Sequence, residues 1–295
     1  MEQLNGRNAF ITGGAGGIGL AMARAFLNEG MNVAIADVDP EALAGAAEAL
    51  AGSNAKLVTV ELDVTDRARF TRAVDEAEAA LGPIHVLCNN AGVYRGGAMD
   101  AVTYEDWDWV MGVNVGGVVN GLQTLVSRMK AHGEGGHIVN TASMAGVSTS
   151  PGLGVYNASK FAVVGMSEAL RGDLEPHGIG VSVLCPGMVR TRILESERTR
   201  PESYDVSDNE AVAAAEAHSA VMNLAMNTGI EPAEVADMVV EGIKTNQLYL
   251  FPHPEMRGAV AERMETLLSA FGEPDPERLA RQEQFMGQLL GETGD

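Results

Sequence analysis

The chain has 295 residues, 46% of them hydrophobic and 5% aromatic, which is enough apolar material for one large core. Its net charge of −20 would repel nucleic acid and anionic membranes, so we expect neither as a partner. We also expect no signal peptide and no membrane-spanning helix, because no apolar run approaches ~18 residues. Cys88 and Cys185 each follow an apolar run, which favours buried thiols in a reducing cytoplasm over a disulfide framework.

The first segment has the pattern of a strand, a glycine-rich turn and a helix. An apolar run leads into residues 12–19, T-G-G-A-G-G-I-G, and a helical pattern follows. Gly13, Gly17 and Gly19, with Ile18 among them, permit a tight turn that a ligand can approach closely. The helix N-terminus would offer N–H groups to a pyrophosphate. The segment therefore predicts a dinucleotide site, with a plain glycine turn as the alternative.

The next predicted strand ends at Asp37, at the spacing after Gly19 expected for an acid that binds the adenosine ribose. A carboxylate there repels a 2′-phosphate, and the following residue, Val38, is not basic. We therefore predict NAD rather than NADP. The alternative is that Asp37 caps the helix starting after Pro40, but Asp39 is better placed for that cap.

Strands and helices alternate along most of the chain. We predict strands over 56–62, 84–88, 137–141, 180–184 and 247–251, and helices over 40–51, 66–81, 107–130, 155–175 and 232–244. This alternation, without an internal linker, is typical of a doubly wound parallel α/β fold. We treat residues 1–295 as one cofactor-binding domain.

Two strand ends carry further candidate cofactor residues. Asp63 and Val64 follow one strand, where a carboxylate could accept from the adenine amino group or cap a helix beginning near Thr65. Asn90, Ala91 and Gly92 follow another. These small residues would let the backbone lie against the cofactor, although Asn90 could instead tie neighbouring strands together.

Three polar residues in apolar or glycine-rich surroundings are candidates for chemistry. Asn114 lies within the predicted helix 107–130, where a buried amide must find hydrogen-bond partners and could hold a water. Tyr156 and Lys160 are four residues apart, so a helix places them on one face. An ammonium beside a phenol favours the phenolate and would make an acid/base unit. A solvated pair on an exposed face is the alternative.

The last third of the chain has a different pattern. Residues 193–229 contain polar clusters and a short Ala-rich helix over 209–222, and we interpret them as a mobile substrate lobe. Residues 254–295 form a helical C-terminal extension with two predicted amphipathic helices broken near 272–274. These helices could cap the pocket, pack on a second subunit or cover the domain.

The chain resembles the short-chain dehydrogenase/reductase family in its compact single-domain branch, because several motifs occur in that family's order. They are T-G-G-A-G-G-I-G, D-V, N-N-A-G, Asn114, Ser143, Y-N-A-S-K and P-G-M-V-R-T, within residues 5–250. The resemblance implies a three-layer Rossmann-like fold, NAD as cofactor, and a homodimer or homotetramer. It also implies interconversion of a secondary alcohol and a ketone by hydride transfer.

The resemblance also implies residue roles. Tyr156 would be the general acid/base, and Lys160 would lower its pKa and hold the nicotinamide ribose. Ser143 would hydrogen-bond the substrate oxygen, and Asn114 would anchor a water that relays protons. The nicotinamide end would meet Pro186, Gly187, Val189 and Thr191.

The substrate pocket is expected to be apolar, which disfavours a charged sugar phosphate. Its candidate residues are Tyr94, Met144, Val147, Leu153, Met188 and Ile193. Residues 103–109 and 248–255 resemble a subgroup that includes bacterial Cα-dehydrogenases, which oxidise benzylic alcohols of lignin-derived aryl ethers. A steroid or alicyclic alcohol is the alternative substrate.

Other function classes fit less well. Ser143 lacks the G-x-S-x-G context of a hydrolase, and the six histidines lack ligand spacing, so we expect no metal. A redox sensor that binds NAD(H) without turnover would not need Asn114, Ser143, Tyr156 and Lys160 together.

Overall fold

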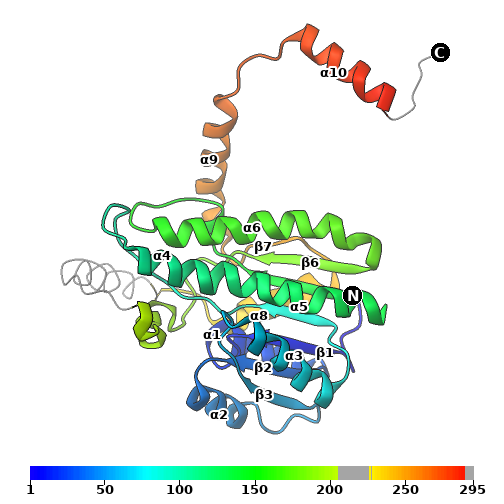
Figure 1. Cartoon of the computed structure of the whole chain (residues 1–295), viewed down its shortest axis with the longest axis vertical. Coiled ribbons are helices and arrows are strands. Elements are labelled where there is room, and N and C mark those ends of the chain that lie inside the picture. The colour runs from blue at the N-terminus through cyan, green and yellow to red at the C-terminus, as the bar shows by residue number, and fades with distance from the viewer. Residues whose placement is uncertain (205–225, 227, 290–295) are drawn as a thin grey trace. The chain divides into compact units, whose positions relative to one another are not determined.

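Seven parallel strands form one sheet in the order β3-β2-β1-β4-β5-β6-β7 (Figure 1). The computed structural model describes residues 1–204, 226 and 228–289. The strands are β1 (Asn8–Thr12), β2 (Asn32–Asp37), β3 (Leu57–Glu61), β4 (Val86–Asn89), β5 (Gly136–Thr141), β6 (Ile179–Leu184) and β7 (Tyr249–Leu250). The strand order reverses between β1 and β4, which creates a crevice at the carboxyl edge of the sheet where ligands bind in such folds.

Helices cover both faces of this sheet. They are α1 (Gly17–Asn28), α2 (Pro40–Ala49), α3 (Arg67–Leu81), α4 (Tyr104–Met111), α5 (Gly117–His132), α6 (Gly154–Leu174) and α8 (Pro232–Lys244). One core joins the sheet to α1, α2 and α8, and the other joins it to α3, α5 and α6. The predicted three-layer, doubly wound α/β fold is confirmed.

The strand sequences are continuously apolar because both sheet faces are buried. In β1, Ala9 and Ile11 enter the core with α1, whereas Phe10 between them enters the core with α3. All three side chains are fully buried. Successive side chains of a strand point to opposite faces of the sheet, so one apolar strand contributes to both cores.

The predicted helix over 107–130 is interrupted. Helix α4 ends at Met111, five residues from Gly112 to Gly116 form a π-helical turn, and α5 starts at Gly117. The helix also begins earlier than predicted, because Thr103 and Asp106 form a capping box at its start. The π turn contains Asn114, the residue that the sequence identified as a candidate for chemistry.

Two short 3₁₀ segments follow β6, at Ile193–Thr199 and Glu202–Tyr204. The helix predicted over 209–222 lies outside the described residues. The chain divides into two compact units, Met1–Pro254 and Glu255–Asp295. Within the described part of the chain, no helix is long and apolar enough to cross a membrane.

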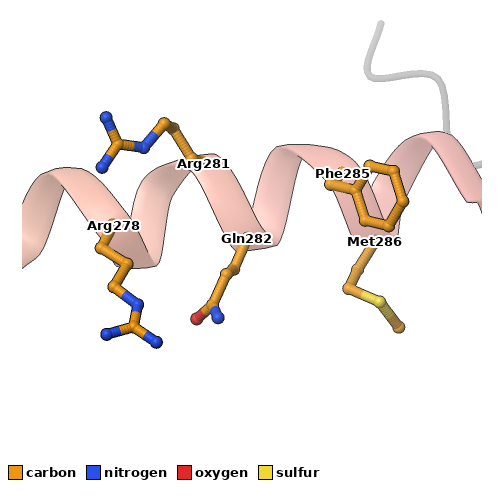
Figure 2. Close-up of a pocket in the computed structure, with 5 residues that line it drawn as sticks. All are labelled: Arg278, Arg281, Gln282, Phe285 and Met286. Carbon is orange, nitrogen blue, oxygen red and sulfur yellow. The ribbon is translucent and has the colours of Figure 1, made fainter.

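The second unit contains α9 (Arg257–Ser269) and α10 (Pro276–Leu289), separated near residues 272–274 as predicted. Apolar side chains are exposed on both helices and on the link between them, including Leu268 (69%), Phe271 (79%) and Phe285 (61%). A hollow on α10 is lined by Arg278, Arg281, Gln282, Phe285 and Met286 (Figure 2). Figure 2 shows Arg278, Gln282 and Met286 on one side of the helix and Arg281 on the opposite side.

Candidate active site

The glycine turn lies between β1 and α1 at the carboxyl edge of the sheet. Gly13 and Gly17 have positive φ values of 62° and 51°, which favour glycine. A Cβ at Gly13 would lie 2.9 Å from the Ala91 Cα, and one at Gly17 would lie 2.9 Å from the Thr191 Cγ2. Helix α1 has no side-chain cap at Gly16, so its first N–H groups are available for an anion.

Asp37 ends β2 next to this turn. Its carboxylate accepts hydrogen bonds from the backbone N–H groups of Ala15 (3.2 Å) and Asp39 (3.3 Å). Asp39 caps α2 by accepting from the N–H groups of Glu41 and Ala42. The capping alternative for Asp37 is therefore wrong. The following residue, Val38, is 46% exposed although it is apolar.

Asp63 lies beyond β3, and the prediction that it could cap the next helix is wrong. Its Oδ1 accepts from the Thr65 N–H (2.9 Å) and hydroxyl (2.8 Å), so it closes its own turn. Helix α3 begins later, at Arg67, where Asp66 is the cap. The carbonyl of the neighbouring Val64 accepts from the Asn120 amide at 2.8 Å.

Asn90 ties three strands together at their carboxyl ends. Its amide donates to the carbonyls of Thr12 and Gly13 (3.1 and 3.2 Å), and its Oδ1 accepts from the Thr141 hydroxyl (3.3 Å). The Thr12 hydroxyl in turn accepts from the N–H groups of Asn90 and Ala91. The structural alternative for Asn90 is confirmed, and Thr12 is a supporting residue that sequence reasoning did not single out.

Asn114 is buried at the centre of a hydrogen-bond network. Its Oδ1 accepts from the Val93 N–H (2.8 Å), and its amide donates to the Val93 carbonyl and the Ser159 hydroxyl (both 3.0 Å). Ser159 then donates to the Tyr156 carbonyl at 2.8 Å. Gly92 lies beside this network, because a Cβ there would be 3.3 Å from Asn114 Oδ1 and 3.4 Å from Lys160 Nζ.

Helix α6 carries both Tyr156 and Lys160 into the site. The Lys160 ammonium lies 5.6 Å from the centroid of the Tyr156 ring and donates to the Thr141 carbonyl at 3.0 Å. Ser143 follows β5, accepts from the Ala145 N–H and donates to the Pro186 carbonyl. The alternative of a solvated surface pair is wrong, since Lys160 is only 3% exposed.

The predicted direction of the Tyr156 pKa differs from that in the structure. Burial raises the pKa of the Tyr156 phenol to about 12, against the opposing effect of a hydrogen bond with Ser143. Burial also lowers the pKa of the Lys160 ammonium to about 8. The cost of burying either charged form therefore exceeds the attraction that the four-residue spacing suggested.

The segment after β6 runs back toward the glycine turn. Its Val189 forms an isolated parallel bridge with Ile230. The bonds of this bridge run from the Ile230 N–H to the Met188 carbonyl (3.1 Å) and from the Arg190 N–H to the Ile230 carbonyl (3.0 Å). Because extended backbone alternates, the N–H and C=O of Val189 point to the opposite side.

Apolar side chains surround Tyr156. Its ring meets that of Tyr94 edge-on, with centroids 5.3 Å apart. The same cluster includes Leu153, Met188, Ile193, Leu194 and Met226. Met144 and Val147 are also buried, on the short turn that follows Ser143. Four of the six predicted pocket residues thus gather in one cluster with Tyr156, and two lie next to Ser143.

Comparison with known proteins gives consistent matches. The model of the short chain dehydrogenase family matches residues 7–202. A C alpha-dehydrogenase from a Sphingobium species is 38% identical over 283 residues, 94% of this chain and 91% of the relative.

Solved structures match over a similar share of this chain. A short-chain dehydrogenase/reductase from Burkholderia phymatum, in complex with NAD, is 36% identical with a TM-score of 0.87 and covers 94% of this chain and 99% of its own. The apo form of LigO from Sphingobium is 34% identical with a TM-score of 0.80 and covers 100% of both chains. The chain therefore belongs to the short-chain dehydrogenase family, in the subgroup that contains the Cα-dehydrogenase, and is an oxidoreductase that interconverts an alcohol and a ketone.

Proposed function

We propose that the chain is an NAD-dependent dehydrogenase of secondary alcohols in which Tyr156 carries the proton. The observation that carries this proposal is the meeting of Tyr156, Ser143 and Lys160 at the carboxyl edge of the sheet, beside the glycine turn. A hydride acceptor bound along this edge would lie within reach of an alcohol held by Ser143 and Tyr156.

The residues on the β1–β3 side of the edge fit the adenosine half of NAD. Gly13, Gly17, Ile18 and Gly19 form a turn with open donors at the start of α1, which suits a pyrophosphate. Asp37 would accept from the ribose hydroxyls, with exposed Val38 beside the adenine. Asp63 and Val64 would border the adenine from β3.

The residues on the other side fit the nicotinamide half. Backbone at Asn90, Ala91 and Gly92 would lie along its ribose, and Lys160 would donate to the ribose hydroxyls. The segment with Pro186, Gly187, Val189 and Thr191 would hold the carboxamide, because Val189 presents one N–H and one C=O away from Ile230. Bound NAD supplies a ring that accepts or releases a hydride.

The protonation state of Tyr156 determines which proton-transfer role its phenol suits. With a pKa of about 12, Tyr156 is protonated at neutral pH and suits the role of general acid in ketone reduction. Alcohol oxidation needs the phenolate, which the burial of Tyr156 disfavours. Ser143 would donate to the substrate oxygen as negative charge develops there. Asn114, with Ser159, holds the backbone around Tyr156 and would anchor a water leading toward Lys160.

The apolar cluster around Tyr156 supports an apolar secondary alcohol as substrate. We propose a benzylic alcohol, because the aromatic ring of Tyr94 faces the site and the Cα-dehydrogenase is a relative. Tyr94, Met144, Val147, Leu153, Met188 and Ile193 would contact the substrate. A steroid or alicyclic alcohol is the second candidate, since an apolar lining accepts either.

The test is NAD reduction at alkaline pH with a panel of benzylic, alicyclic, steroid and short aliphatic secondary alcohols. NADP is measured in parallel. We expect the highest kcat/KM with a benzylic alcohol and NAD. A preference for steroids would replace the substrate assignment and keep the mechanism. Tight NADH binding without turnover of any alcohol would instead support a redox sensor.

We also propose that the enzyme is a cytoplasmic homodimer or homotetramer. Both cysteines, Cys88 and Cys185, are free and buried, which suits a reducing compartment. Helices α5 and α6 carry small and apolar residues that suit a subunit interface. Light scattering of the purified protein would give the subunit number, and a monomer at micromolar concentration would refute the assembly.

A further inference from the structure

A buried histidine holds the segment that we assign to the nicotinamide carboxamide. His253 lies just beyond β7 and is 6% exposed. Its Nδ1 accepts from the Gly187 N–H at 3.0 Å, and its Nε2 lies 2.9 Å from the Met188 carbonyl oxygen. Because Nδ1 accepts a backbone hydrogen bond, the ring proton of the neutral imidazole is on Nε2, which donates to Met188.

These bonds act on the two residues that precede Val189. The Met188 carbonyl also accepts from the Ile230 N–H, so this peptide is fixed from two directions. The parallel pairing of β6 and β7 brings His253 to this backbone, since the segments after the two strands leave the sheet at the same edge. His253 is therefore the side chain that holds the peptides at 187 and 188, together with the backbone of Ile230 at Met188.

We propose that His253 is a positioning residue for the nicotinamide ring, acting through the 187–189 backbone. The inference rests on the proposed function, because it needs the carboxamide to bind at Val189. By fixing Gly187 and Met188, His253 sets the direction of the Val189 N–H and C=O before the cofactor arrives. Pre-organised donors and acceptors avoid an ordering cost on binding, so loss of His253 weakens the nicotinamide half of the site alone.

Two substitutions separate hydrogen bonding from packing. His253→Phe keeps a ring of similar size and removes both bonds, whereas His253→Gln offers one acceptor and one donor again. His137→Phe is the matched control. His137 is also buried, and its Nε2 lies 2.8 Å from the Ser182 hydroxyl, but it lies near the amino end of β5, away from the carboxyl edge.

The experiment measures the Kd of NADH and of ADP-ribose, which lacks the nicotinamide, for the full-length variants by calorimetry. For His253→Phe we expect the NADH Kd to rise about tenfold, equivalent to one hydrogen bond lost between Val189 and the carboxamide. The ADP-ribose Kd should change less than about twofold. His253→Gln should lie between wild type and His253→Phe. His137→Phe should leave the ratio of the two Kd values unchanged.

Equal weakening of both ligands in His253→Phe would show a general structural role and overturn the proposal. An unchanged NADH Kd in both His253 variants would overturn it as well. Failure of the proposed function would be seen in the wild type itself, as no binding of NADH or no turnover of any alcohol of the panel.

Discussion

The two halves of the carboxyl edge are built differently. On the β1–β3 side, Asp37 and Asp63 each accept from the backbone N–H two residues further along, Asp37 also accepts from the Ala15 N–H, and Asp63 is exposed. On the β4–β6 side, Asn114 is 1% exposed and Lys160 is 3% exposed. Their partners, Ser159 and Thr141, are 45 and 19 residues away in the sequence. One half holds its carboxylates with backbone N–H groups, and the other is a buried network of side chains.

Because the two halves are built differently, we expect substitutions in them to have different effects. A change on the β1–β3 side should alter cofactor affinity and choice and leave the chemistry intact. A change of Ser143 or Tyr156 on the β4–β6 side should alter turnover, because these side chains would lie at the reacting atoms. The following substitutions test this division, from the largest expected effect to the smallest.

Tyr156→Phe should have the largest effect. Without the phenol, kcat should fall by about 10³-fold, within the range for loss of a general acid/base. The Kd of NADH should change by less than about twofold. Tyr249→Phe is the control, since Tyr249 is exposed and bonds to Glu168 outside the site. Residual activity above a few per cent of wild type would remove Tyr156 as the proton carrier.

Ser143→Ala should follow, with kcat lowered about 10²-fold by loss of a donor to the developing oxyanion. Ser148→Ala provides the comparison, because the Ser148 hydroxyl donates to the Met144 carbonyl in its own turn. Steady-state kinetics with the best alcohol of the panel measures both. Similar kcat values for the two variants would exclude Ser143 from the chemistry.

Asp37→Ala should change cofactor choice. Removal of the carboxylate should raise the ratio of kcat/KM for NADP over NAD by about tenfold or more, since hydrogen bonds to a charged group contribute about 1.5–3 kcal/mol. Asp39→Ala should lower the unfolding free energy by about 1 kcal/mol through loss of the α2 cap, without changing the ratio. An unchanged ratio in Asp37→Ala would refute the ribose assignment.

The smallest effect is on stability and concerns the burial of Lys160. Its folded pKa is about 8 against an ordinary value of 10.5, so between these values only the unfolded lysine keeps its proton. Below pH 8 both states are protonated and the burial cost is complete. Above it the unfolded state binds more protons, so stability rises with pH.

The unfolding free energy of wild type should therefore rise by about 1 kcal/mol or more between pH 8 and 10, relative to Lys160→Met. The raised pKa of Tyr156 acts in the opposite direction above pH 10, so the measurement stops there. Denaturant titrations at each pH provide the values. Parallel pH dependences for the two proteins would contradict the buried, pKa-shifted lysine.

The same division explains what the sequence could predict. The cap at Asp39, the glycines at 13 and 17 and the apolar strands depend on near neighbours, so local patterns identified them. Asn114, within the π turn, bonds to Val93 and Ser159, which are 21 and 45 residues away. No local pattern reports such partners, and a continuous helix was therefore predicted.

The other differences between the sequence predictions and the structure result from burial and distant contacts. The spacing of Tyr156 and Lys160 indicated their shared helix face, but the direction of the Tyr156 pKa depends on how deeply the fold encloses both groups. Thr12 and Asn120 support the site through hydrogen bonds to Asn90 and Val64, which are 78 and 56 residues away in the sequence. Ser159 links Asn114, 45 residues away, to the Tyr156 carbonyl. In the sequence, His253 has the pattern of a loop residue after an apolar segment. The pairing of β7 with β6 brings it beside Gly187.

The most direct test of this account measures kcat and the NADH Kd for Tyr156→Phe and Asp37→Ala side by side. The account predicts a crossed result. Tyr156→Phe should lose kcat and keep the Kd, whereas Asp37→Ala should raise the Kd and keep kcat at saturating cofactor. If both variants changed the same parameter in the same way, the division of the edge into a binding half and a reacting half would be contradicted.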